Sequence, residues 1–190
     1  MQQPAMRTRP AVPADCEPLA AVHYRSWMAA YRGVMADSFL ATLSPEGFRS
    51  YARPRLERPD PGQAFLVAES AGAIVGFARA GPTRAVSPTG DALPDGFTRH
   101  ASAELYAVYV DPPAFGTGAG AELLSASAVA MAAAGHRSMC VWVLTENTRA
   151  LAWYRRRGAE PIAVAPITLA GVAYPQTALL WKDLAALTSG

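Results

Sequence analysis

The sequence predicts a single domain of the mixed α/β (α+β) class, and three observations support that prediction. Its 190 residues amount to little more than one typical domain of about 150 residues. Hydrophobic residues make up 51% of the chain and charged residues 17%, so there is enough apolar material for one core. Residues 64–78 have the pattern of two strands around a tight turn, and residues 105–134 that of a strand, a glycine-rich loop and a helix.

The chain begins with a predicted strand and a long helix. We expect residues 1–6 to be flexible and residues 7–11 to form an edge strand. Asp15 stands at the N-cap of a helix that reaches Tyr31, because apolar side chains recur at helical spacing until Gly33 ends the pattern.

Shorter elements follow before a hairpin. One helix is predicted over residues 38–43 and another after Ser44, which is followed by Pro-Glu. Prolines then indicate a surface connection over residues 53–62. Apolar runs at residues 64–69 and 73–78 flank a Ser-Ala-Gly turn and predict two antiparallel strands.

The middle of the chain holds the most informative segment. Residues 81–99 are rich in Pro, Gly and Asp without periodicity, which predicts a long exposed loop that serves binding or is mobile. A strand over residues 105–110 ends at Asp-Pro-Pro, and an alanine-rich helix is predicted over residues 121–134.

The last third is predicted to alternate strands with one helix. A strand is expected over residues 139–144, followed by a helix that Asn147 caps and whose last turn carries Arg155 to Arg157. Two closing strands are expected over residues 161–165 and 176–181.

Charge and cysteine content exclude several classes of protein. The formal net charge of +2 is too small to favour nucleic acid as a partner. No run of about 18 apolar residues and no secretory signal is present, so we expect no membrane contact and a cytoplasmic location. Cys16 and Cys140 lie far apart without a histidine at ligand spacing, so we expect two buried or half-buried thiols and no metal site.

The glycine loop, residues 115–120, has the composition of a phosphate site. Glycines at positions 116, 118 and 120 remove side chains from the start of a helix, where backbone N–H groups and the helix dipole attract anions. Glycines also serve close packing or a tight turn, so this pattern alone leaves both interpretations open.

A dinucleotide site is one specific interpretation of the loop. The spacing Gly116-x-Gly118-x-x-Ala121 fits the pattern, and Glu146 ends the following strand. However, four residues separate the strand from the first glycine, Glu146 comes late, and too little chain follows for further βαβ units.

A second interpretation covers more of the chain. Residues 103–124, AELYAVYVDPPAFGTGAGAELL, resemble the acyl-CoA-binding motif of the GNAT N-acetyltransferase superfamily, and Asn147-x-x-Ala150-x-x-x-Tyr154-x-x-x-Gly158 is similar to its next motif. The match is best over residues 64–160. The resemblance implies a GNAT-like single domain over residues 1–190, with a twisted, mostly antiparallel mixed sheet flanked by helices.

The same resemblance implies how acetyl-CoA is held. Backbone amides of three residues would contact the thioester and the pantetheine arm: Val108, Tyr109 and Val110. Amides of the next segment would hold the pyrophosphate: Gly116, Thr117, Gly118, Ala119, Gly120 and Ala121. Asn147 would add a hydrogen bond near the pantetheine, although an N-cap role is its commoner duty.

Acyl transfer needs a proton acceptor for the amine and a proton donor for the leaving thiolate. The resemblance gives the donor role to Tyr154; the alternative is a packed aromatic ring. Glu104 is the best carboxylate for the base, and a solvated edge charge is the alternative. His23 and His100 are reserve bases, each more often structural or exposed.

Other residues bear on binding with less specificity. Phe115 occupies a position where the family usually has Gln or Arg, which predicts weaker cofactor binding without its loss. Trp27 and Tyr31 could line the acceptor pocket or belong to the core. Arg155 to Arg157 could meet phosphates, with solvation of a helix end as the simpler account.

The sequence therefore predicts an enzyme that transfers an acetyl group from acetyl-CoA to a primary amine of a small molecule or peptide. The alternative is a non-catalytic acyl-CoA-binding or regulatory domain. The acceptor pocket would come from residues 20–50 and 81–99, where no pattern encodes a substrate. The exposed closing strands are compatible with a homodimer.

Overall fold

The computed structural model describes residues 5–188. Of the amino-terminal residues predicted to be flexible, 1–4 lie outside this part, and Met6 already pairs with Ser70 in a strand. In chain order the elements are β1 (Met6–Pro10), η1 (Pro13–Asp15), α1 (Cys16–Tyr31), α2 (Asp37–Leu40), α3 (Pro45–Glu57), β2 (Ala64–Ser70), β3 (Ala73–Pro82), η2 (Phe97–Arg99), β4 (Ala103–Val110), η3 (Pro112–Ala114), α4 (Ala119–Ala133), β5 (Met139–Leu144), α5 (Thr148–Arg155), β6 (Glu160–Leu169), β7 (Val172–Trp181) and α6 (Ala185–Thr188).

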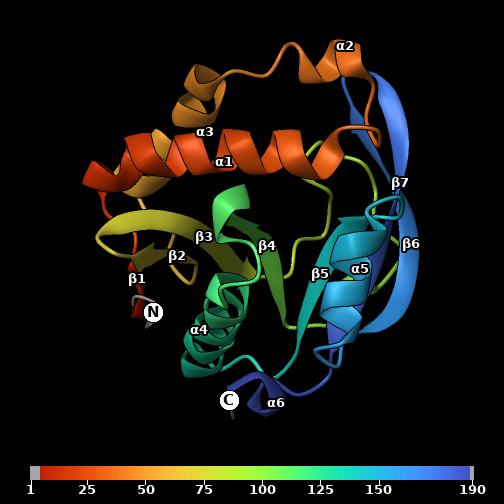
Figure 1. Ribbon diagram of the computed structural model, residues 1–190. Coiled ribbons are helices and arrows are strands. Elements are labelled where there is room, and N and C mark those ends of the chain that lie inside the picture. Colours follow the sequence, from red (N-terminus) through yellow and green to blue (C-terminus); the bar gives the residue numbers. More distant parts are fainter. Residues whose placement is uncertain (1–4, 189–190) are drawn as a thin grey trace. The chain divides into compact units, whose positions relative to one another are not determined.

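The sheet has the strand order β1-β2-β3-β4-β5-β7-β6 (Figure 1). β1 with β2, β2 with β3, β5 with β7, and β6 with β7 are antiparallel, whereas β4 and β5 are parallel. This confirms the predicted mostly antiparallel mixed sheet flanked by helices. It also rules out the dinucleotide interpretation, which needs consecutive parallel strands.

The described residues form two compact units, one of residues 5–80 and 107–127 and the other of residues 81–106 and 128–188. Both β4 and α4 contribute residues to each unit. That residues 1–190 act as a single domain stays a prediction.

The first unit packs helices on both faces of its strands. Alternate side chains of a strand point to opposite faces, so Val67 and Phe77 pack with α1 and α3, whereas Ala68 and Ala78 pack with α4. In Figure 1, α1 and α3 lie on one side of β2 and β3 and α4 lies on the other.

Helix α3 is longer than the sequence predicted. The connection expected from residue 53 onward is wrong, because the helix continues through Pro54 to Glu57. Ser44 caps its start by accepting a hydrogen bond from the Gly47 N–H at 3.2 Å. Ala52 and Leu56 are buried against α1, and this burial outweighs the cost of a proline inside the helix.

Asp15 occupies the N-cap position of α1, but its side chain does not cap that helix. Its carboxylate accepts hydrogen bonds from Arg9 at 2.6 and 2.8 Å and from the Val12 N–H at 2.8 Å. The arginine on the neighbouring strand therefore competes successfully for this side chain.

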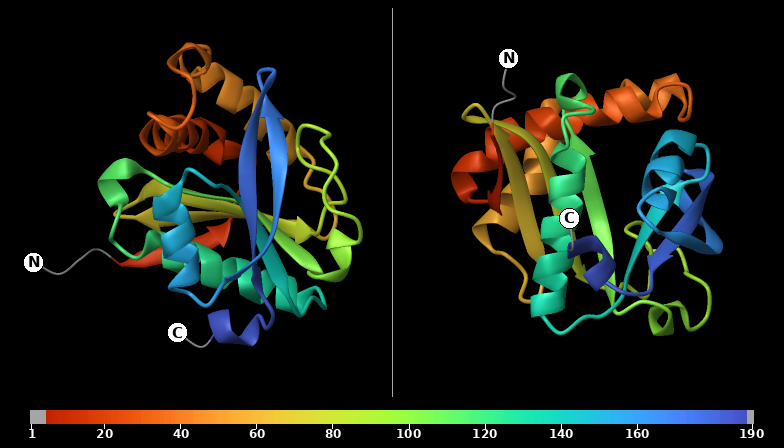
Figure 2. Two further views of the ribbon diagram at one scale, coloured as in Figure 1. Left: turned by 90° about the vertical axis from the view of Figure 1, so that its right-hand side faces the viewer. Right: turned by 60° about the horizontal axis from the view of Figure 1, so that its bottom comes forward.

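The second unit centres on β5 and β7, and the predicted long exposed loop is partly buried against them. Phe97, in η2, is 2% exposed and packs with Cys140 and Ala178. The apolar surface of the sheet draws this part of the loop inward, so the loop is exposed only in part. Figure 2 shows β6 and β7 as a long pair of strands. Both strands extend further towards the turn that joins them than the sequence predicted. Helix α6 was not predicted.

Candidate active site

The glycine loop begins where β4 ends and leads into α4. The 3-10 turn η3 follows Asp111, and the Ala114 N–H donates to the Asp111 carbonyl at 2.8 Å. Gly116 and Gly118 then adopt φ values of +80° and +97°, which residues with a Cβ avoid. A Cβ at either glycine would meet no atom within 4 Å, so the space beside the loop is open.

Several backbone N–H groups at the start of α4 are unused. Within residues 5–188, four of them donate to no protein acceptor: those of Gly116, Gly118, Ala119 and Gly120. The Thr117 N–H bonds to Ala114 O at 3.3 Å and the Ala121 N–H to Gly118 O at 2.9 Å. Unpaired N–H donors at the start of a 15-residue helix attract anions, so this loop is a candidate site for a diphosphate.

The predicted thioester strand lies beside that loop in the same unit. Val108 and Val110 pack against Ala119 and Leu123 of α4, whereas Tyr109 packs on the other face beside Phe77, with ring centres 5.5 Å apart. The predicted cofactor residues 108–110 and 116–121 are thus brought together in the first unit.

His23 lies in a group of aromatic rings on the α1 side of β4. Its ring centre is 4.3 Å from that of Phe48 and 4.7 Å from that of Tyr109. Burial, helped by the charge of Arg79, lowers the pKa of His23 to about 3, so the imidazole is neutral at pH 7. This environment favours the structural interpretation of His23 over the reserve base.

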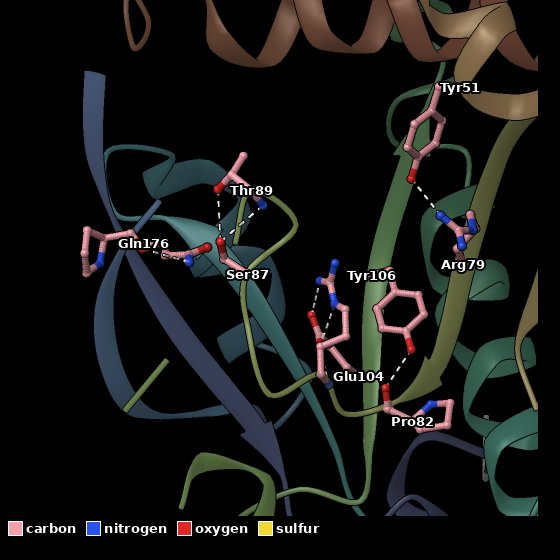
Figure 3. Close-up of polar contacts among 10 residues, drawn as sticks. Tyr51, Arg79, Pro82, Ser87, Thr89, Glu104, Tyr106 and Gln176 are labelled. Atoms are coloured by element: carbon pink, nitrogen blue, oxygen red, sulfur yellow. Dashed lines mark hydrogen bonds and ion pairs between the residues drawn. The ribbon is translucent and has the colours of Figure 1, made fainter. Parts of the chain in front are cut away.

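Trp27 and Tyr31, the predicted acceptor-side residues, belong to the same group. Their ring centres are 4.7 Å apart, and both side chains are half-buried. Burial raises the pKa values of Tyr31 and Tyr109, which keeps both phenols neutral at pH 7. Figure 3 shows the nearby Arg79 guanidinium donating to the Tyr51 hydroxyl, at 2.6 Å.

Glu104, the predicted base, lies at the start of β4 and is neither solvated nor at an edge. It is 1% exposed, and the guanidinium of Arg84 donates to both of its oxygens. The Arg84 backbone N–H donates to it as well, at 3.1 Å. Arg84 also lies over the ring of Tyr106, 4.5 Å from its centre. The edge-charge alternative is therefore wrong, and the base role stays a prediction.

Asn147 and Tyr154 lie at the two ends of α5 in the second unit. The Asn147 carbonyl oxygen of the side chain accepts from the Ala150 N–H at 3.1 Å, which confirms the N-cap duty. The ring of Tyr154 is buried and packs edge-on to Trp153 and Trp181, with centre distances of 4.9 and 5.6 Å. The proton-donor role of Tyr154 stays a prediction.

The remaining candidates have simpler surroundings. Arg157 lies over the Trp153 ring, and burial lowers its pKa. Arg155, Arg156 and His100 are exposed. Within the part of the chain that the structure describes, no group of three or more metal-ligating side chains gathers, and no helix has the length and apolar character to cross a membrane.

Two residues of the site region had no signal in the sequence. Arg84 lies in the segment predicted as an exposed loop, 20 positions before the carboxylate it binds. Arg25 binds Asp111 across 86 positions. Pairs this far apart leave no periodic pattern, so neither could be found from spacing.

Three comparisons place this fold among known proteins. The acetyltransferase (GNAT) family model matches residues 24–159. The N-acetyltransferase YuaI of Bacillus subtilis, described as uncharacterised, is 29% identical over 173 residues, which cover 91% of each chain. Two solved structures share the fold. The PaiA N-acetyltransferase of Thermoplasma acidophilum, in complex with coenzyme A, has a TM-score of 0.66 and 17% identity over 91% of this chain and 98% of that one. YncA of Salmonella typhimurium, a putative acetyltransferase with acetyl-CoA, has a TM-score of 0.63 and 24% identity over 94% of each chain.

Fold and sequence together define an acyltransferase of the N-acetyltransferase class. The chain belongs to the acetyltransferase (GNAT) family, because that family's model matches well over half of it. This confirms the family and the enzyme class that the sequence predicted.

Proposed function

We propose that this protein transfers the acetyl group of acetyl-CoA directly to a primary amine of a small molecule or peptide. The observation that carries the proposal is the set of unused N–H groups at Gly116, Gly118, Ala119 and Gly120, in a chain of this family. They supply the donors that a diphosphate needs, and because they belong to the main chain, Phe115 in place of Gln or Arg does not remove them. A cytoplasmic location and a homodimer remain predictions from the sequence.

Each predicted residue has one task in the reaction. The amine nitrogen forms the amide bond with the acetyl carbonyl carbon, and the carbon–sulfur bond breaks. Backbone amides of residues 108–110 would polarise that carbonyl. Glu104 would take the proton that the amine loses, directly or through water, and Tyr154 would give its phenol proton to the departing sulfur. Arg84 donates hydrogen bonds to the carboxylate of Glu104, and these bonds must rearrange before Glu104 can take up a proton.

The direct test is release of free thiol from acetyl-CoA in the presence of a panel of amines. The panel covers amino acids, polyamines, aminoglycosides and peptide amino termini. We expect one class to give turnover well above the hydrolysis of acetyl-CoA alone. Turnover with none of them, together with retained coenzyme A binding, would support the non-catalytic alternative.

The arrangement around Glu104 gives that alternative a specific basis, because an ion-paired carboxylate suits a structural role. Tyr154→Phe tests the catalytic function, because only an enzyme would lose turnover while it keeps its affinity for the cofactor. The substitution keeps the ring that packs on Trp181, so we expect kcat to fall about 100-fold while coenzyme A affinity changes less than about twofold. Tyr174→Phe, on β7, is the matched control. Unchanged kcat in Tyr154→Phe would exclude the phenol as the proton donor.

A further inference from the structure

Helix α1 is joined to the end of β4 by two consecutive pairs of residues. The Arg25 guanidinium donates to both oxygens of Asp111, at 2.8 and 2.6 Å. The neighbouring Ser26 hydroxyl donates to the Val110 carbonyl at 2.8 Å. All four residues belong to the first unit.

These contacts are more directional than a typical surface pair. A two-pronged arginine–carboxylate contact fixes both orientation and distance. Ser26 is 3% exposed, and a buried helical serine usually bonds to a carbonyl of its own helix. Here the Ser26 hydroxyl bonds to the last residue of β4 instead, which attaches α1 to that end of the strand.

Asp111 is fixed at three points. Its N–H donates to Val75 O of β3 at 2.8 Å, its carbonyl accepts from the Ala114 N–H, and its side chain is held by Arg25. The next two residues are Pro112 and Pro113, which have restricted φ values and form η3. Because the turn between them is stiff, the orientation of Asp111 therefore determines the position of the glycine loop.

On the basis of the proposed function, we propose that Arg25 is a positioning residue for cofactor binding. Through Asp111 it holds the stiff turn so that the unused N–H groups of the glycine loop point at one diphosphate. The family resemblance places helix α1 on the acceptor side. Through Arg25 this helix thereby contributes to the binding of acetyl-CoA without contacting it.

A simpler role for Arg25 would be a positive charge near the phosphates. The two roles predict opposite effects of substituting Asp111 on the affinity for coenzyme A. If charge alone matters, Arg25→Gln weakens binding of a diphosphate and Asp111→Asn strengthens it. If the pair positions the loop, both substitutions weaken binding, and the double variant is no worse than either single one.

The test is calorimetry of coenzyme A with the full chain, its Arg25→Gln and Asp111→Asn variants and the double variant. We expect each single variant to bind coenzyme A about five times more weakly than the wild type. The double variant should show no further loss of affinity. Arg25→Lys, which cannot make the two-pronged contact, should fall in between. Arg49→Gln is the control, because that arginine pairs with Glu17 of α1 and Glu46 of α3 and should leave the affinity unchanged.

Amide hydrogen exchange without ligand gives a second readout. We expect the Ala114 and Phe115 N–H groups, which bond within the turn, to exchange faster in Arg25→Gln than in Arg49→Gln. Tighter binding in Asp111→Asn, or unchanged affinity and exchange in both single variants, would overturn the positioning role alone. No binding of coenzyme A by the wild type would contradict the proposed function, and the positioning role with it.

Discussion

Gly118 shows how much of the candidate site depends on the conformation of a single residue. Its φ of +97° disfavours any side chain, although a Cβ there would meet no atom within 4 Å. We expect Gly118→Ala to lower the free energy of unfolding by about 1–2 kcal/mol through backbone strain and to weaken coenzyme A binding as the loop readjusts.

Gly62 provides the matched control for that prediction. It has a φ of +77°, equally open surroundings, and a place outside the glycine loop. Gly62→Ala should lower thermal stability by a similar amount and leave coenzyme A affinity unchanged. Equal affinities in the two variants would show that the conformation of Gly118 does not serve binding.

The pair of Glu104 and Arg84 allows the base role to be separated from the structural one. Glu104→Gln and Arg84→Gln break the same contact, so each should lower the free energy of unfolding by about 1–3 kcal/mol. Only Glu104→Gln removes the carboxylate, so kcat, measured below both melting temperatures, should fall much further in that variant. An equal loss of kcat in both would contradict the base role.

Local chemistry was predictable at this scale, and distant partners were not. The sequence predicted Asn147 as an N-cap, because a cap depends on neighbouring residues. It did not predict the arginine that binds Glu104, because that contact depends on which chain segments meet in the fold. The loss of Asp15 as a cap is an exception, because Arg9 is only six positions away along the chain.

Among the elements, the segment between β3 and β4 departs most from its prediction. Asp91 accepts hydrogen bonds from the Thr168 N–H and hydroxyl, at 2.9 and 2.7 Å, and from the Ser87 hydroxyl at 3.0 Å. These bonds tie the segment to β6 near the turn of the β6–β7 hairpin. A segment rich in Pro and Gly is thus held in place by a few polar bonds that composition does not reveal.

This attachment should depend on pH. The Thr89 hydroxyl, followed by the N–H and hydroxyl of Thr168, lowers the pKa of Asp91 below its ordinary value of about 3.8. A lowered pKa means that the bonds stabilise the fold above about pH 4 and are lost as the pH falls through the lower, folded-state pKa. We expect the melting temperature of Asp91→Asn to lie below that of the wild type at pH 6, with the difference closing towards pH 2.

Asp95→Asn, an exposed carboxylate on the same segment, is the control and should follow the wild type throughout. If the melting temperatures of Asp91→Asn and wild type differed by the same amount at pH 6 and pH 2, ionisation of Asp91 would not hold the segment.

The outer edge of β6 bears on the predicted homodimer. Pro166 lies opposite Pro175 of β7, and the Pro175 carbonyl accepts from the Thr145 N–H on the β5 side. Pro166 therefore turns its nitrogen, which has no hydrogen, towards the free edge. A missing donor there disfavours pairing with a second β6, so a dimer is better sought through other surfaces.

At the scale of the whole molecule, the class of fold was predictable because several independent signals agreed. The hairpin at residues 64–78, the strand–loop–helix at residues 103–133 and the closing strands all lie where the sequence indicated, within a few residues. The strand order was not predictable from periodicity, which says which residues are buried but not which strands are neighbours. The family resemblance predicted only that the sheet is mixed and mostly antiparallel, which the structure confirms.

The central claim is that main-chain N–H groups of the glycine loop bind the diphosphate of coenzyme A. The most direct measurement is the shift of amide resonances in the labelled protein on addition of coenzyme A, compared with pantetheine, which lacks the diphosphate. The account predicts that the N–H signals of Gly116, Gly118, Ala119 and Gly120 move with coenzyme A and stay in place with pantetheine. Saturating binding of coenzyme A that left these four signals unmoved would contradict it.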